Sequence, residues 1–178
     1  LKAKYAEAIE ALTPRLRAGM RIHILKDVYP AGDEVITIWM ATGRRVPPAG
    51  LPRDVGVAVN NVLTLINLAR AVDEDQPVTT RTLTVTGAVA QPVTVTVPLG
   101  VSLREVLAQA GGESVQSAAY IDGGPMMGKL VSSLDAPVTK TTGGLIVLPE
   151  DHILIRRRRA SERSVLETAR TTCEQCLL

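Results

Sequence analysis

The chain has only two cysteines, Cys173 and Cys176, three positions apart near its C-terminal end. Two thiolates cannot complete a structural zinc site or hold an iron–sulfur cluster, because each of these takes about four ligands. The spacing leaves two interpretations. The pair is redox-active, or it is the first half of a cluster motif whose other ligands follow Leu178.

A second group of polar residues lies in the segment YPAGDE, residues 29–34. Tyr29 can stack on a planar ring, and Gly32 allows backbone to approach a ligand closely. Asp33 and Glu34 stand where a helix is expected to begin, and a first helical turn favours negative charge. An ordinary loop with an acidic helix cap explains the same residues.

The segment VNNVLT, residues 59–64, is the third candidate. Asn60 and Asn61 follow an expected strand at its carboxyl end, where open α/β sheets bind ligands. Thr64 falls on the first turn of the next helix, whose N–H groups favour anions. A simple asparagine helix cap is an equally good interpretation.

A fourth candidate is the glycine-rich loop GGPMMGK, residues 123–129. It lacks the spacing of a phosphate-binding P-loop, so it indicates either contact with a cofactor or partner, or a tight turn between strands. The two histidines, His23 in an expected strand and His152 in an expected loop, have no companion histidine. We interpret both as structural and expect neither a zinc site nor a nucleophilic enzyme.

The elements that must position these residues change in character near residue 81. Before it, apolar periodicity predicts alternating helices and strands, which is typical of a parallel α/β sheet. Only two strands are expected there, so the segment resembles the C-terminal part of a larger domain. The expected elements are helices at 1–12, 35–42 and 62–72 and strands at 20–26 and 55–61.

After residue 81 the sequence predicts an α+β unit. Threonine alternates with Val or Leu at period two, which is typical of half-buried antiparallel strands. A helix follows with Ser102 and Glu105 as a capping box and Gly111–Gly112 as its end. Two more strands and a final helix complete a β-grasp-like order. The expected strands are 81–89, 93–100, 118–123 and 143–149, and the last helix covers 161–172.

Composition narrows the class of protein only moderately. The chain is 46% hydrophobic with a net charge of +2, which is ordinary for a globular protein, and we expect no nucleic-acid partner. No apolar run reaches the roughly 18 residues of a membrane span, and the first residues do not resemble a signal peptide. We therefore expect a cytoplasmic protein.

Taken in order, these segments resemble one family. It comprises the Rnf electron-transport C subunit and the cobalamin (corrin) reductase of propanediol-utilisation microcompartments, both similar to the NADH-oxidising flavin subunit of respiratory complex I. The segments that carry the resemblance are YPAGDE, TGRRVPPAGLPRDVGVAVNNVLT, RTLTVTGAV, VPLGVSLREVLAQAGG, DGGPMMGK and DAPVTKTTGGLIVLP.

The resemblance implies a fold class of α/β plus α+β. Residues 1–80 would form the C-terminal half of a Rossmann-like FMN- and NADH-binding domain. Residues 81–150 would form a β-grasp (soluble-ligand-binding) domain. Residues 151–178 would form a linker and helix leading into an iron–sulfur domain. On this interpretation the chain is a fragment, whose glycine-rich flavin phosphate loop precedes Leu1.

The resemblance also implies roles for the candidate residues. Tyr29, Gly32, Asp33 and Glu34 would line the flavin and nicotinamide site, with Glu34 as the catalytic residue that orients nicotinamide or flavin. Asn60, Asn61 and Thr64 would contact FMN. Cys173 and Cys176 would be the first two ligands of a [4Fe–4S] cluster, because family members continue with a third cysteine and then C-P.

The function implied is transfer of electrons from NADH through FMN and [4Fe–4S] clusters to cobalamin. The expected partners are NADH, cobalamin and a redox protein, with an adenosyltransferase as one candidate. The expected location is a bacterial microcompartment in the cytoplasm. The Rnf C subunit, peripheral on the inner membrane and coupling NADH to ferredoxin, is the first alternative. A non-catalytic β-grasp module that binds cobalamin or a partner protein is the second. We expect the chain alone to be inactive as an NADH oxidase.

Overall fold

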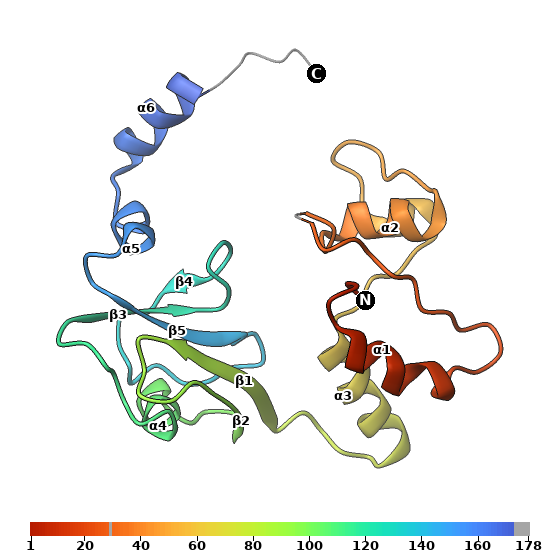
Figure 1. The fold of residues 1–178 in the computed structure, drawn as a ribbon, viewed down its shortest axis with the longest axis horizontal. Helices are drawn as coiled ribbons and strands as arrows, with labels where there is room; N and C mark the ends of the chain where they lie inside the picture. Colours follow the sequence, from red (N-terminus) through yellow and green to blue (C-terminus); the bar gives the residue numbers. More distant parts are fainter. Residues whose placement is uncertain (29, 173–178) are drawn as a thin grey trace. The chain divides into compact units, whose positions relative to one another are not determined.

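The structure is a computed structural model that describes residues 1–28 and 30–172. It separates the chain into two compact units, Leu1–Ala69 and Arg70–Leu178, which we call unit 1 and unit 2 (Figure 1). Helices dominate unit 1, and a β-sheet with flanking helices forms unit 2. The chain as a whole therefore has the mixed α/β character that the sequence predicts.

Unit 1 contains short helices and a small core. Only Leu25, Ala31 and Ile38 are buried apolar residues among its described residues. The elements are α1 (Ala6–Leu12), η1 (Thr13–Arg15), α2 (Glu34–Thr42), η2 (Pro52–Val55) and α3 (Val62–Asp73), the last of which continues into unit 2.

The two strands predicted in unit 1 are not present, and this part of the prediction is wrong. Residues 20–26 form no strand and make only one isolated parallel bridge, between Leu25 and Lys2. Residues 55–61 make no ladder at all in the described structure. A strand is defined by hydrogen bonds to a neighbouring strand, and apolar composition without such a neighbour does not form one. His23 consequently lies on an exposed segment.

The helices of unit 1 follow the sequence more closely. The first helix begins only at Ala6, because the preceding residues bond to Leu25 and then turn: the Leu25 N–H donates to the Leu1 carbonyl at 2.7 Å, and the Ala3 N–H donates to the Leu25 carbonyl at 3.0 Å. The helix predicted at 35–42 is confirmed as α2, with Asp33 as its N-cap and Gly43 as its C-cap.

Unit 2 is built on a mixed sheet of five strands in the order β2-β1-β5-β3-β4. All neighbours are antiparallel except β1 and β5, which run parallel. The four predicted strands are confirmed, and β4 was not predicted because it has only two residues. The strands are β1 (Thr80–Gly87), β2 (Val93–Pro98), β3 (Ala118–Asp122), β4 (Lys129–Leu130) and β5 (Gly144–Pro149).

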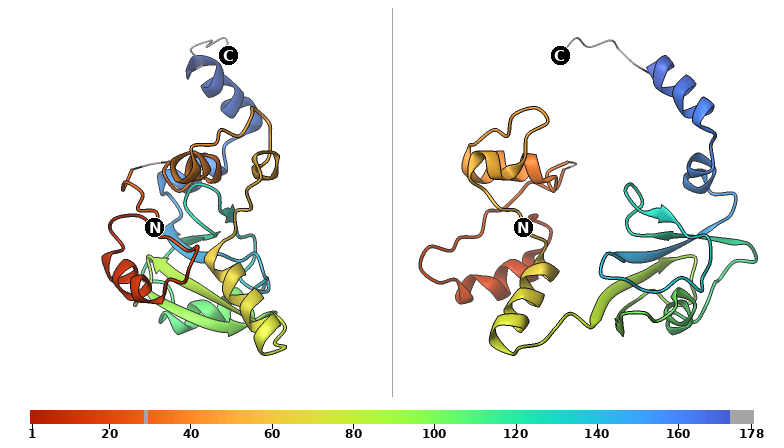
Figure 2. Two further views of the ribbon diagram at one scale, coloured as in Figure 1. Left: turned by 90° about the vertical axis from the view of Figure 1, so that its right-hand side faces the viewer. Right: turned by 180° about the vertical axis from the view of Figure 1, so that it is seen from behind.

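Each face of the sheet buries apolar side chains, because residues alternate between faces along a strand. On one face Val85, Leu145 and Val147 pack against helix α4 (Leu103–Gln109), which contributes Val106 (Figures 1 and 2). On the other face Ile121 packs with Ile155 of helix α5 (Ile153–Arg158). Helix α6 (Glu162–Thr172) follows, with all its residues exposed.

The period-two threonines of β1 and β2 pair across the strands. Thr82 bonds Thr96 at 2.8 Å and Thr84 bonds Thr94 at 2.9 Å through their hydroxyls. Such pairs stabilise neighbouring strands by a few tenths of a kcal/mol each, up to about 1 kcal/mol. The alternation read from the sequence is therefore a real two-faced strand pair, apolar toward α4 and hydroxyl-bearing on the other side.

The capping box predicted for α4 is confirmed. The Glu105 N–H donates to Ser102 Oγ at 3.2 Å, and the Ser102 N–H donates to Glu105 Oε2 at 3.1 Å. Hydrogen bonds from the side chain and backbone of Ser102 hold the pKa of Glu105 below its usual value. This box fixes where the chain turns from the β2 edge into the helix that covers the core.

Helix α5 begins directly after His152, where the sequence predicts a loop. The His152 ring accepts a hydrogen bond from the Leu154 N–H at 3.2 Å and so caps the helix. Its structural role was predicted correctly, although its surroundings were not. Within the arginine run of 156–159, Arg158 is half-buried.

Candidate functional site

The start of helix α2 brings three of the predicted site residues together. The Asp33 carboxylate accepts hydrogen bonds from the Val35 and Ile36 N–H groups, at 2.9 and 3.2 Å through Oδ1. Asp33 is thus engaged as a helix cap, as the alternative interpretation holds. Glu34 is exposed on the first turn and makes no hydrogen bond or ion pair within the described chain. Glu34 is therefore the carboxylate that remains available to a ligand.

The space next to the Cα atom of Gly32 could hold a side chain. A Cβ added there would meet only Lys2 Cε, at 3.9 Å, and the residue has no left-handed backbone. Neither turn geometry nor packing within the described residues requires a glycine at this position. Close approach of a flat ligand to the backbone would require one. The flavin contact expected of Gly32 stays a prediction.

The start of helix α3 holds the second predicted group. Asn61 Oδ1 accepts a hydrogen bond from the Leu63 N–H at 2.9 Å, so Asn61 caps this helix. Asn60 and Thr64 are exposed, and neither side chain has a partner in the described part of the chain. The strand that was expected to lead into these residues is absent, but the helix N-terminus is present, with its Leu63 N–H bonded to Asn61.

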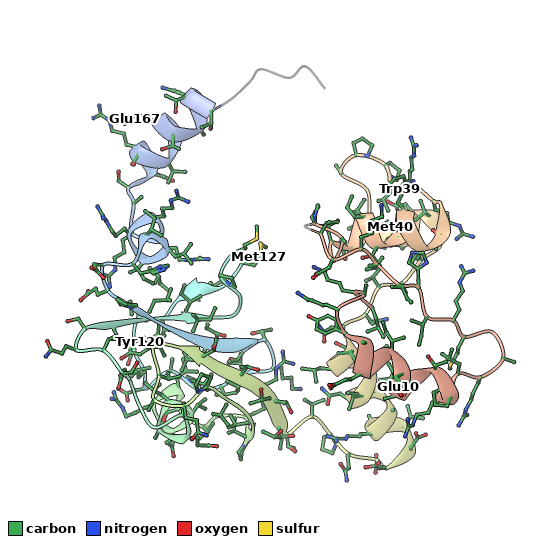
Figure 3. The ribbon with its side chains drawn as sticks, viewed as in Figure 1. Glu10, Trp39, Met40, Tyr120, Met127 and Glu167 are labelled. Carbon is green, nitrogen blue, oxygen red and sulfur yellow. The ribbon has the colours of Figure 1, made fainter. Side chains whose placement is uncertain are left out.

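The structure gives no contact that joins the two groups. Among residues 1–28 and 30–172, no hydrogen bond or ion pair links the α2 start to the α3 start, although both belong to unit 1. A shallow cavity of about 250 Å³ lies beside α2 and is lined by Trp39 and Arg45 among others (Figure 3 labels Trp39). The assignment of these residues to one flavin site stays a prediction.

Three of the predicted residues lie outside the described part of the chain. They are Tyr29, Cys173 and Cys176. The described chain reaches Thr172, the last residue of α6, directly before the first cysteine. Among the residues that are described, no three His, Cys, Asp or Glu side chains gather as a metal site.

The glycine-rich loop between β3 and β4 is held by Arg158, which is not among the predicted site residues. The Arg158 guanidinium donates to the carbonyls of Gly128, Pro125 and Met126, the last two at 2.8 and 3.0 Å. Met127, at the loop tip, is 90% exposed (Figure 3). The signal available in the sequence was an arginine within a basic run following Ile155, and nothing local distinguishes it from its neighbours.

A tyrosine with an altered pKa lies on the α4 side of β3. Burial and the hydrogen bond that Tyr120 donates to the Glu113 carboxylate raise the pKa of Tyr120 to about 12. The same hydrogen bond lowers the pKa of Glu113. Both shifts favour the neutral phenol beside the carboxylate at neutral pH.

The pH dependence of stability follows from these directions. A tyrosine ordinarily titrates near pH 10, so the unfolded chain loses this proton before the folded chain does. The stabilisation is fully present below about pH 10 and decreases toward pH 12. We expect Tyr120→Phe to remove this slope, so that urea unfolding shows a wild-type advantage at pH 8 that shrinks by pH 11.5. A wild-type advantage that grew with pH would contradict the assignment.

Two family models match the chain, one in each part. Residues 1–70 match the Nuo51 FMN-binding domain, and residues 82–130 match the SLBB domain. The chain therefore carries a match to an FMN-binding domain followed by a match to an SLBB domain.

Similarity to individual proteins narrows the family to which the chain belongs. The chain is 67% identical to the cobalamin reductase PduS of Citrobacter freundii and 68% identical to that of Salmonella typhimurium, in both cases over all 178 residues. It covers 40% of the length of each. It is also 38% identical over 148 residues to the C subunit of the Na⁺-translocating ferredoxin:NAD⁺ oxidoreductase complex of Acetobacterium woodii, covering 82% of this chain and 33% of that protein. The chain belongs to the family that the cobalamin reductases and these C subunits form.

One solved structure supports the fold. It is an NAD⁺-reducing [NiFe]-hydrogenase in the H₂-reduced state, matched with a TM-score of 0.64 and 24% identity over 85% of this chain and 33% of that one. No helix among residues 1–28 and 30–172 is both long enough and apolar enough to cross a membrane.

Proposed function

We propose that the chain is part of a cobalamin reductase that takes electrons from NADH through FMN and [4Fe–4S] clusters to cobalamin. One observation carries this proposal: the identity to two cobalamin reductases is 67–68% over the whole chain. The C subunits of ion-translocating complexes reach only 34–38% over about four fifths of it. Such a gap is expected when the closer group shares the substrate as well as the fold.

The domain layout is proposed on the same basis. Residues 1–80 would be the C-terminal half of a Rossmann-like FMN- and NADH-binding domain. Residues 81–150 would be a β-grasp domain, and 151–178 a linker into an iron–sulfur domain. The sheet of unit 2, with α4 on one face, supports the β-grasp assignment. The match of residues 1–70 to an FMN-binding domain supports the assignment of residues 1–80 to the FMN- and NADH-binding domain.

The candidate site residues of unit 1 have distinct roles in the proposed function. FMN, when bound, would accept a hydride and release electrons one at a time. Glu34, exposed on the first turn of α2, would hold the nicotinamide amide or a flavin N–H as a hydrogen-bond acceptor. Gly32 would let the ring lie against backbone. Asn60 and Thr64 would bind the flavin through their free polar atoms, beside the positive end of the α3 dipole.

The C-terminal cysteines would supply iron ligands in the complete protein. Cys173 and Cys176 follow α6 directly, and their spacing suits two corners of one [4Fe–4S] cluster. The proposed location is the cytoplasm within a microcompartment, and an adenosyltransferase is one candidate partner. The alternative is a C subunit bound to a membrane complex, for which ferredoxin and not cobalamin would be the acceptor.

Substitution of Glu34 in the full-length protein tests its proposed role in NADH oxidation. We expect Glu34→Gln to lower kcat/KM for NADH about tenfold or more, the loss typical of one positioning hydrogen bond, while FMN content stays unchanged. The control is Glu10→Gln, which removes an exposed carboxylate from α1. Equal activity of the two variants with cobalamin as acceptor would remove Glu34 from the mechanism. Reduction of ferredoxin but not cobalamin by the wild type would favour the C-subunit alternative.

A further inference from the structure

Unit 2 contains a cavity of about 420 Å³, and none of its lining residues is a predicted flavin residue. Its walls are residues 118–120 of β3, the segment 130–134 that begins in β4, and Arg159. The volume falls within the range of small-molecule sites, which runs from about 300 to 1,000 Å³. The apolar part of the lining comes from alanine, leucine and valine side chains.

The cavity exists because β3 and the segment after β4 separate. The two strands pair through Asp122 and Lys129, and the Val131 N–H still donates to the Tyr120 carbonyl at 2.9 Å. The next hydrogen-bonded pair in this register would be Ala118 with Ser133, and the structure gives no hydrogen bond between them. The chain has turned away by that point, which opens the space.

The separation leaves one residue with its main-chain groups directed into the gap. The Glu150 N–H donates to the Ser117 carbonyl, so Ser117 and Ala119 face β5. Alternate residues of an antiparallel strand bond to opposite edges, so the N–H and C=O of Ala118 face the cavity beside those of Tyr120. Neither group of Ala118 has a partner in the part of the chain that is described. Half-buried main-chain groups of this kind favour a ligand that bonds to both.

The charged and hydroxyl groups around the cavity narrow the ligand class. Arg159 Nη1 donates to Glu150 Oε1 at 2.8 Å, so the one cation of the lining is already neutralised. The Tyr120 hydroxyl is engaged by Glu113. An anionic ligand would have to displace Glu150 from Arg159, whereas a neutral ligand would not. Addition of a peptide strand is also disfavoured, because only one residue of the edge is free.

We propose that this cavity binds the primary carboxamide of a small neutral ligand. The amide carbonyl accepts from the Ala118 N–H, the amide N–H donates to the Ala118 carbonyl, and the apolar body lies against Leu130 and Leu134. The identity of the natural ligand rests on the proposed function. Two molecules of that reaction carry primary carboxamides: the nicotinamide of NADH, and cobalamin at the edge of its corrin ring.

The test is a titration of the whole chain with benzamide, followed by ¹H–¹⁵N NMR. We expect saturable shifts confined to residues 118–120 and 130–134, with a dissociation constant of about 1–10 mM for a ligand of this size. Benzoate has the same ring but cannot donate to the Ala118 carbonyl and must compete with Glu150, so it should bind at least about tenfold more weakly. Equal or tighter binding of benzoate overturns the proposal, as does the absence of saturable shifts with benzamide.

Two variants and two competitors complete the experiment. Ser132→Trp places a large ring at an exposed position of the lining and should abolish the benzamide shifts, whereas Gln116→Trp, exposed outside the cavity, should not. If the Ser132→Trp protein still binds benzamide, the ligand does not bind in this cavity and the proposal is overturned. Displacement of benzamide by nicotinamide, by cyanocobalamin or by both identifies the source, and displacement by neither removes the link to the proposed reaction. Failure here leaves the Glu34 test untouched, because that test measures NADH oxidation in unit 1.

Discussion

Replacing Gly87 with alanine is expected to destabilise unit 2 by roughly 2–5 kcal/mol, a large part of the stability of an ordinary domain. Gly87 ends β1 with φ of +96°, which an L-residue adopts only at a cost. An added Cβ would lie 2.1 Å from the Val147 carbonyl oxygen, an atom of the central strand that cannot move independently. Hydrogen exchange measured by mass spectrometry should show faster exchange throughout β1 and β5.

Three other glycines separate backbone strain from steric overlap. Gly100 has φ of +92° with nothing within 4 Å of an added Cβ, so alanine there should cost about 1–2 kcal/mol. At Gly128 the Cβ would meet the Gly124 carbonyl oxygen at 2.5 Å without left-handed backbone, and about 1–3 kcal/mol is expected. Gly124 has neither feature, so its alanine variant should stay within about 0.5 kcal/mol of wild type. A Gly87→Ala protein as stable as Gly124→Ala would show that β1 and β5 are not paired as described.

The second large effect concerns Arg158. Replacing it with glutamine removes the donor of three main-chain carbonyls in the loop 123–128, and we expect a loss of roughly 2–3 kcal/mol. The loop should then exchange its amide protons faster, beginning with the Gly128 N–H, which donates to the Gly124 carbonyl at 2.8 Å. Exchange of this amide, resolved by NMR, is the measurement.

The neighbouring arginine provides a matched control. Arg157 is exposed and makes no side-chain hydrogen bond or ion pair among residues 1–28 and 30–172, so Arg157→Gln should leave the loop unchanged. Arg158→Lys should fall between the two, because an ammonium cannot reproduce the planar fork that reaches several carbonyls at once. Equal exchange in the Arg158→Gln and Arg157→Gln proteins would mean that the loop is held by its own turn alone.

The sequence predicts unit 2 well because its signals are local. The period-two threonines place Leu83 and Val85 on one face without knowledge of the rest of the fold. The box of Ser102 and Glu105 likewise sets the start of α4 from side chains three residues apart. Strand β4 and helix α5 escaped prediction because two and six residues are too short to show a period.

Unit 1 shows where local signals are insufficient. Residues 20–26 are rich in apolar and β-branched side chains, yet only Leu25 is buried and only one bridge forms. A helix cap, in contrast, depends on residues within one turn of each other. Asp33 and Asn61 both cap helices, as their residue types predict. The same shortness of range explains why the sequence names Glu34 and Asn60 as candidates but cannot state whether they meet.

The sequence by itself determined the family, the caps of α2, α3 and α4, the four longer strands and the types of residue available to a flavin or a cluster. Each of these depends on neighbours in the chain or on similarity to known sequences. Only the tertiary structure decided that Arg158 holds a loop thirty residues away, and that β3 separates from its neighbour at Ala118. These two features arise from segments distant in sequence that come together in the folded chain, and such contacts leave no periodic mark in the sequence.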